Sequence, residues 1–130
     1  PSWLYPISKG ATTIWEHWDG IKPNGDIWPV SMNSYNHYAY GAVGVWMYGV
    51  VAGINTVEEA PGFAKVHFSP IPDDRIDWFK AEIQTAYDRV SSRWWHEDGK
   101  VHYEIITPVD STAVIEDKEY NLSPGKHIII

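Results

Sequence analysis

The sequence contains no cysteine among its 130 residues. This absence excludes a disulfide framework, a thiolate zinc site and a cysteine nucleophile. Basic residues are also few, since 10 Lys and Arg stand against 17 Asp and Glu and the formal net charge is -7. A surface that binds phosphate groups needs a surplus of basic side chains, so we expect no nucleic-acid partner.

Motifs of several common enzyme classes are absent as well. The chain has no G-x-S-x-G elbow, no Walker loop and no G-x-G-x-x-G turn. The D-x-D-x-D-G run of a calcium loop is missing too, although Asp19 and Asp26 lie close together in a turn-rich segment. We therefore expect neither a cofactor nor a metal site.

One long stretch, residues 38–54, lacks charged side chains. It is shorter than the roughly 20 apolar residues that a membrane span needs, and it contains four glycines. We therefore expect a buried helix and no membrane span. Gly53 can mark the end of that helix, because glycine adopts the left-handed cap conformation without a Cβ clash.

Aromatic residues are abundant, with eight Trp and eight Tyr. This is more than a small core needs, and it indicates the interior of a larger structure. The chain begins at Pro1 and opens on Trp3, Leu4 and Tyr5, with no preceding element to pack against them. We expect the chain to be a fragment that continues an upstream part of the same parent chain.

After residue 54 the pattern changes. A polar linker ends at Pro61-Gly62, and apolar residues then recur at every second position in short runs, which is typical of half-buried antiparallel strands. Asp98-Gly99 between two such runs predicts a tight hairpin. About six strands are expected, which suits a β-sandwich. The predicted strands lie near residues 66–68, 79–84, 90–97, 100–107, 111–116 and 126–130.

The second half shows no catalytic constellation. Its four histidines share no short spacing, so we expect surface or edge residues and no metal ligands. Trp94 and Trp95 are adjacent on a predicted strand and must point to opposite faces, so one indole belongs to the core. A carbohydrate-binding role for this half stays open.

Glu16 is the first candidate for chemistry. It lies in GATTIWEHWD (residues 10–19), where one carboxylate is flanked by two indoles. Sugar-processing sites use this combination, because a carboxylate activates water while aromatic faces pack against a pyranose. Thr13 and Glu16 also have the S/T-x-x-E spacing of a helix capping box, and local spacing alone favours that structural role.

A second segment, MNSYNHYAYGAVG (residues 32–44), carries amide, hydroxyl and imidazole groups. Together with GATTIWEHWD it resembles the end of the catalytic domain of bacterial α-L-rhamnosidases, inverting glycoside hydrolases with an (α/α)6 barrel. Later segments, VAGI, FSPIP and WFKAE, resemble the same family, so the likeness covers nearly the whole chain. It implies that Glu16 is the general base and that His37 lines the rhamnose pocket.

The resemblance implies an α+β chain, with the last helices of an (α/α)6 barrel in residues 1–54 and an antiparallel β-sandwich in residues 55–130. We expect part of an α-L-rhamnosidase that acts on a rhamnose-containing glycan or glycoside, with the general acid outside this chain. The fragment alone should be inactive and should self-associate. Two alternatives remain: another (α/α)6 glycosidase or phosphorylase with a different sugar, and a non-catalytic glycan-binding or interdomain sandwich.

Overall fold

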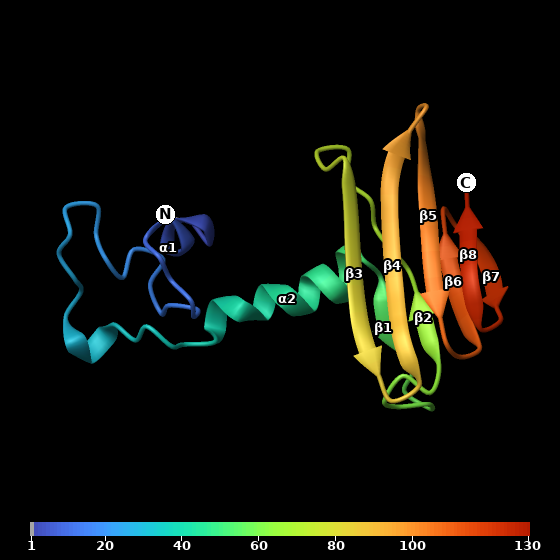
Figure 1. Ribbon diagram of the computed structural model, residues 1–130, viewed down its shortest axis with the longest axis horizontal. Coiled ribbons are helices and arrows are strands. Elements are labelled where there is room, and N and C mark those ends of the chain that lie inside the picture. The colour runs from blue at the N-terminus through green and yellow to red at the C-terminus, as the bar shows by residue number, and fades with distance from the viewer. Residues whose placement is uncertain (1) are drawn as a thin grey trace. The chain divides into compact units, whose positions relative to one another are not determined.

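The computed structural model describes residues 2–130, which form two compact units (Figure 1). The first unit ends at Gly44 and the second comprises Val45–Ile130. The domain boundary between residues 54 and 55 stays a prediction.

The first unit consists mainly of loops. Its helical elements are α1 (Leu4–Ser8) and the two 3-10 turns η1 (Val30–Met32) and η2 (Ala39–Ala42). The segment between α1 and η1 is rich in glycine and proline and forms a loop. A β-bridge between Ile21 and Ile27 closes this loop. Trp15 is buried and anchors the unit.

The predicted helix before residue 54 is present. The turn η2 is followed directly by α2 (Val43–Trp46) and by the π-helical element η3 (Met47–Val51). It ends as predicted, because Gly53 has a φ of +66° and its backbone packs against Pro70. The sequence predicted a helix that is buried on all sides. Within the described residues this is not found, because Val51 is the one buried residue of η3. No helix in residues 2–130 is long and apolar enough to cross a membrane.

The second unit is a β-sandwich of two four-stranded sheets. One sheet has the order β1-β2-β6-β7 and the other the order β3-β4-β5-β8. The strands are β1 (Ile54–Thr56), β2 (Val66–Phe68), β3 (Trp78–Thr85), β4 (Asp88–Glu97), β5 (Lys100–Thr107), β6 (Ser111–Ile115), β7 (Lys118–Leu122) and β8 (Gly125–Ile129). All neighbouring strands are antiparallel except β2 and β6, which are parallel.

All six expected strands are found, and the α+β class is confirmed. The hairpin at Asp98-Gly99 is confirmed too, because both residues have the positive φ of a primed turn, 51° and 74°. Two strands were not predicted, β1 and β7. In the turn before β7, Glu116 and Asp117 have positive φ, so the sequence has no glycine there to indicate a turn.

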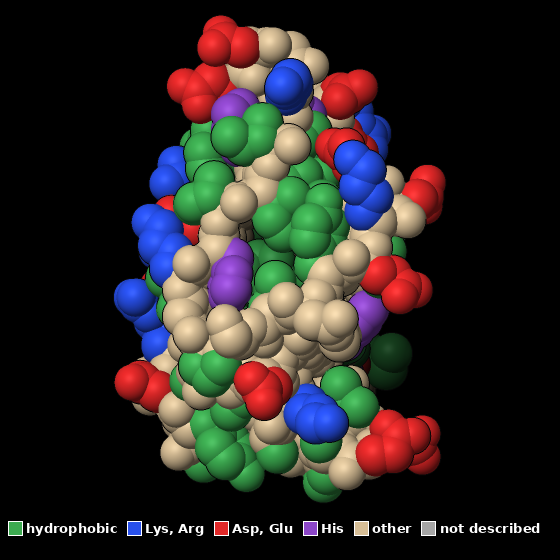
Figure 2. Space-filling view, turned by 90° about the vertical axis from the view of Figure 1, so that its right-hand side faces the viewer, with side chains coloured by type: hydrophobic (Ala, Val, Ile, Leu, Met, Phe, Trp, Pro, Cys, Tyr) green, Lys and Arg blue, Asp and Glu red, His purple; other side chains and the backbone are tan. Residues whose placement is uncertain are grey.

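The core lies between the two sheets. Trp94 is fully buried and its indole N–H donates to the carbonyl of Val51 at 2.8 Å, which ties the helical stretch to the sandwich of this unit. The neighbouring Trp95 points to the other face, as predicted. Figure 2 looks onto the side that carries β7 and β8, where hydrophobic side chains gather between charged side chains.

Candidate functional site

Glu16 lies on an extended loop. None of residues 11–20, all described by the structure, is helical. The hydroxyl of Thr13 donates to the carbonyl of Tyr35 and takes no part in a helix start. The capping-box interpretation is therefore wrong, because the spacing of Thr13 and Glu16 is present without the helix that it would cap.

The two motif segments lie side by side. The backbone N–H of Glu16 donates to the carbonyl of Ser34 at 2.8 Å, and the N–H of His37 donates to the carbonyl of Ile14 at 2.8 Å. The structure thus brings Glu16 and His37, which are 21 positions apart, onto one pair of adjoining backbone segments.

The carboxylate of Glu16 is held on one side. Its Oε2 accepts the backbone N–H of Ser34 at 2.8 Å, and the residue is half-buried. Among the described residues, Oε1 has no hydrogen-bond partner. A carboxylate with one oxygen fixed and the other free has the arrangement that a general base needs, because orientation is set without using the basic lone pairs of Oε1.

The imidazole of His37 is oriented by its own loop. Its Nδ1 accepts the backbone N–H of Ala39 at 3.4 Å, and its ring stacks against Tyr38 with a centroid distance of 6.3 Å. When Nδ1 accepts, a neutral imidazole carries its proton on Nε2. Within residues 2–130, Nε2 has no partner, so it is free to donate to a hydroxyl group.

Aromatic packing fixes the frame around the two segments. Trp15 meets Tyr35 edge to face at 5.0 Å, and the Tyr35 hydroxyl donates to the carbonyl of Gly20 at 3.1 Å. A Cβ on Gly20 would lie 3.1 Å from the Trp15 ring, so a larger residue would displace it. This packing places the residue after Trp15, the carboxylate-bearing Glu16, at a fixed position on the loop.

A second cluster was not found from the sequence. The imidazole of His17 stacks on Trp28 at 5.1 Å, and the Trp28 indole N–H donates to Oδ1 of Asp19 at 3.3 Å. The ammonium group of Lys22 lies 4.6 Å from the centre of the same indole. The density of aromatic and charged residues in this loop was a usable signal, but loops lack the periodicity that pairs residues in helices and strands.

Several buried polar atoms of this unit lack partners among the described residues. They are Nε2 of His17, Nε1 of Trp18 and Oδ1 of Asn33. Buried polar groups are hydrogen-bonded in the great majority of complete structures. These three atoms are therefore exceptions to that pattern among the described residues.

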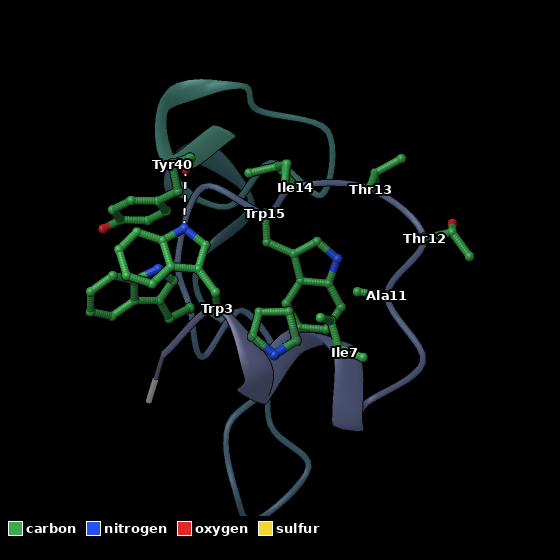
Figure 3. Close-up of a pocket in the computed structure, with 10 residues that line it drawn as sticks. Trp3, Ile7, Ala11, Thr12, Thr13, Ile14, Trp15 and Tyr40 are labelled. Atoms are coloured by element: carbon green, nitrogen blue, oxygen red, sulfur yellow. Dashed lines mark hydrogen bonds between the residues drawn. The ribbon is translucent and has the colours of Figure 1, made fainter. Parts of the chain in front are cut away.

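An apolar hollow of about 310 Å³ opens beside the two segments (Figure 3). Trp3 and Tyr40 lie together on one side of it and Trp15 and Ile7 on the other, and the Trp3 indole N–H donates to the Tyr40 carbonyl at 3.0 Å. Neither Glu16 nor His37 lines this hollow. Most of its lining is indole, proline and aliphatic groups, beside Thr12, Thr13 and Tyr40, so it suits a packing partner better than a reaction centre.

In residues 2–130, no three His, Asp or Glu side chains converge as a metal site would require. In the sandwich, Nδ1 of His67 is within 2.9 Å of the Thr112 hydroxyl, and Nε2 of His127 is within 2.8 Å of the Ser123 carbonyl. These two histidines therefore have local protein partners.

Two family models match this chain. Residues 1–51 match the bacterial alpha-L-rhamnosidase 6 hairpin glycosidase domain, and residues 53–128 match the bacterial alpha-L-rhamnosidase C-terminal domain. An alpha-L-rhamnosidase of Streptomyces avermitilis is 41% identical over 115 residues, which cover 88% of this chain and 11% of that protein.

Solved structures give the same answer. The crystal structure of Streptomyces avermitilis alpha-L-rhamnosidase complexed with L-rhamnose matches with a TM-score of 0.80 and 31% identity, over 98% of this chain and 14% of that one. Native alpha-L-rhamnosidase from Aspergillus terreus matches with a TM-score of 0.81 and 32% identity, over 99% of this chain and 15% of that one. The chain thus spans about one seventh of these structures, and it belongs to the bacterial alpha-L-rhamnosidase family.

Proposed function

We propose that this chain is part of an inverting α-L-rhamnosidase and that it supplies the general base, Glu16, and one wall of the sugar pocket, His37. Residues 1–54 would close an (α/α)6 catalytic barrel and residues 55–130 would form its C-terminal sandwich. The substrate is a glycan or glycoside that ends in α-L-rhamnose. The general acid would come from a part of the parent chain outside these 130 residues.

The chemistry assigned to Glu16 is proton abstraction. In an inverting hydrolysis, a water molecule attacks the anomeric carbon from the face opposite the leaving group while a carboxylate takes its proton. Oε1 of Glu16 would accept that proton as the new C–O bond forms. The acid protonates the glycosidic oxygen, so the aglycone leaves as a neutral alcohol. Because water attacks from the opposite face, the configuration at the anomeric carbon is inverted.

The observation that carries the proposal is the anchoring of Glu16. Its Oε2 is fixed by the N–H of Ser34 at 2.8 Å, and its Oε1 has no partner in the described part of the chain. The same pairing positions His37, whose Nε2 is free to donate to a sugar hydroxyl. A base and a hydroxyl-binding group on adjoining segments suit a site that must hold a sugar and a water molecule together.

The test uses the full-length enzyme that contains this chain. Proton NMR of the first product released from an aryl α-L-rhamnoside should show β-L-rhamnose, before mutarotation mixes the anomers. A panel of aryl glycosides of other sugars, with and without inorganic phosphate, serves as the control. First-formed α-L-rhamnose would contradict inversion, and preferred turnover of another glycoside or a requirement for phosphate would favour the alternative enzymes.

A further inference from the structure

The outer face of the sheet β3-β4-β5-β8 carries a row of aromatic rings, in which Trp78 is exposed and Trp95 and His102 are half-buried. Trp78 on β3 is paired directly with Trp95 on β4, which is paired with His102 on β5. The three strands lie side by side in Figure 1. Directly paired residues share a face of the sheet, and Trp94, the neighbour of Trp95, is fully buried on the opposite face. The row therefore faces away from the sandwich core.

The row is ordered by specific contacts. The Trp95 indole N–H donates to Oε2 of Glu97 at 3.0 Å, and the His102 ring stacks on Trp95 at 5.2 Å. The guanidinium of Arg93 lies 4.8 Å from the centre of the Trp95 ring. Trp95 is thus held in one orientation, whereas its partner Trp78 is 60% exposed.

The charges around the row compensate one another. Lys80 and Glu82 are ion-paired at 3.0 Å, and Lys126 and Glu104 at 2.7 Å. Because these charges are paired, the face presents little net field to attract a polyanion or a polycation. The cores of protein–protein interfaces are also depleted in charged residues, whereas Lys80 and its cross-strand partner Arg93 follow Trp78 on the same face of the sheet. The occupant that fits is neutral and rich in hydroxyl groups.

We propose that this outer face is a glycan-binding platform for a neutral, rhamnose-bearing carbohydrate, separate from the site of Glu16. The pyranose ring would stack on the exposed indole of Trp78, and its hydroxyl groups would bind the carboxylate of Glu97 and the imidazole of His102. Rhamnose is a 6-deoxy sugar, so its methyl group adds apolar surface for an indole. The choice of rhamnose rests on the proposed function, and the platform itself rests on the geometry.

The experiment is affinity electrophoresis of the full-length enzyme in gels that contain a neutral rhamnan, with dextran gels as reference. The protein carries Glu16→Gln, so that the glycan is not consumed. Trp78→Ala is the test variant. Tyr87→Ala is its matched control, because Tyr87 is an exposed aromatic in the turn between β3 and β4, outside the row.

We expect the rhamnan to retard the parent protein and the Tyr87→Ala variant equally, and Trp78→Ala to bind about tenfold more weakly, which is the scale of one lost apolar contact. Trp78→Tyr should retain part of the binding. Equal retardation of the Trp78→Ala variant, or of the parent protein by dextran, would overturn the proposal.

Binding and catalysis are measured separately. In the background with Glu16 intact, Trp78→Ala should hydrolyse a small aryl α-L-rhamnoside at the parent rate, since Glu16 and His37 are unchanged and the substrate carries no further sugar for the platform. An enzyme that releases no rhamnose but keeps retardation dependent on Trp78 would refute the proposed function and leave the platform standing. Full activity without retardation would refute the platform alone.

Discussion

Glu16 and Ser34 hold each other through two hydrogen bonds of 2.8 Å, one between their backbones and one from the Ser34 N–H to the Glu16 carboxylate. Because a carboxamide oxygen also accepts an N–H, glutamine at position 16 can keep the second bond, whereas alanine cannot. Substitution by glutamine therefore separates the chemistry of the carboxylate from its part in the fold.

Gly53 should be intolerant of any side chain. Its φ is +66°, and an added Cβ would lie 2.0 Å from the backbone nitrogen of Pro70. We expect Gly53→Ala to lower the free energy of unfolding by about 3 kcal/mol or more, combining backbone strain with a backbone clash. Gly62→Ala is the matched control, because Gly62 has a φ of +68° and open space around it, so it should lose only about 1 kcal/mol. If chemical denaturation gave the same loss of unfolding free energy for both variants, the close packing of Gly53 against Pro70 would contribute nothing to stability.

His37 has two separable nitrogen atoms. His37→Asn can retain an acceptor near Nδ1 for the N–H of Ala39, whereas His37→Gln can place a donor near Nε2. If Nε2 binds a sugar hydroxyl, His37→Asn and His37→Ala should lower kcat/KM on rhamnosides by about tenfold or more with the melting temperature nearly unchanged, and His37→Gln should recover part of the loss. A large fall in melting temperature with normal kinetics of the folded fraction would make His37 a structural residue.

Tyr103 makes the sandwich sensitive to alkali. Burial raises the pKa of its phenol to about 12, and the nearby charge of Glu116 adds to the effect. Because the folded state favours the neutral phenol, the stability that this phenol adds to the fold is fully present below pH 10. That stability is lost as the pH rises from about 10 to 12. The loss should be about 2 kcal/mol in the free energy of unfolding. Tyr103→Phe should remove this step from a denaturation series across that pH range, and an unchanged step would assign it to another group.

The 130-residue chain by itself should be inactive on an activated aryl rhamnoside, because most of the pocket would come from the rest of the enzyme. It should also self-associate, since Trp46 is 53% exposed and Met47 is 38% exposed on the helical stretch. Sedimentation should show dimers or larger species that Trp46→Lys reduces. A monodisperse monomer with turnover above buffer would contradict both expectations.

The strands were largely predictable because their signals are local. Alternating residues and the Asp98-Gly99 turn place β4 and β5 nearly residue by residue. The strand β7 was not predicted, because Glu116 and Asp117 adopt positive φ in the turn before it. Sequence-based reasoning expects glycine or asparagine at such positions. The strand β1 is only three residues long and contains the polar Asn55, which made it resemble a linker.

The sequence allowed the candidate site residues to be predicted, but it did not allow their spatial arrangement to be predicted. Motif resemblance selected Glu16 and His37, but the hydrogen bonds that join their segments connect residues 18 to 23 positions apart. Such pairings follow no sequence period. The Thr13 to Glu16 spacing suggested a helix cap because spacing is local evidence, and the tertiary contact of Thr13 with Tyr35 overrode it.

The carboxylate of Glu16 is expected to dominate turnover. In the full-length enzyme, Glu16→Gln should fold as the parent does and lower kcat by about 10² to 10⁴, because the attacking water loses its proton acceptor. Asp26→Asn is a matched control, since Asp26 is an exposed carboxylate in the loop after Glu16 and its carboxylate accepts a hydrogen bond from the side chain of Asn24. It should keep parent turnover.

Azide rescue tests the base assignment most directly. Azide needs no deprotonation, and in a Glu16→Ala enzyme it can occupy the space of the missing carboxylate. With an activated aryl α-L-rhamnoside, millimolar azide should restore turnover and yield β-L-rhamnosyl azide, the inverted product. Turnover near the parent value without azide, or a rhamnosyl azide of retained configuration, would contradict the assignment of Glu16 as the general base.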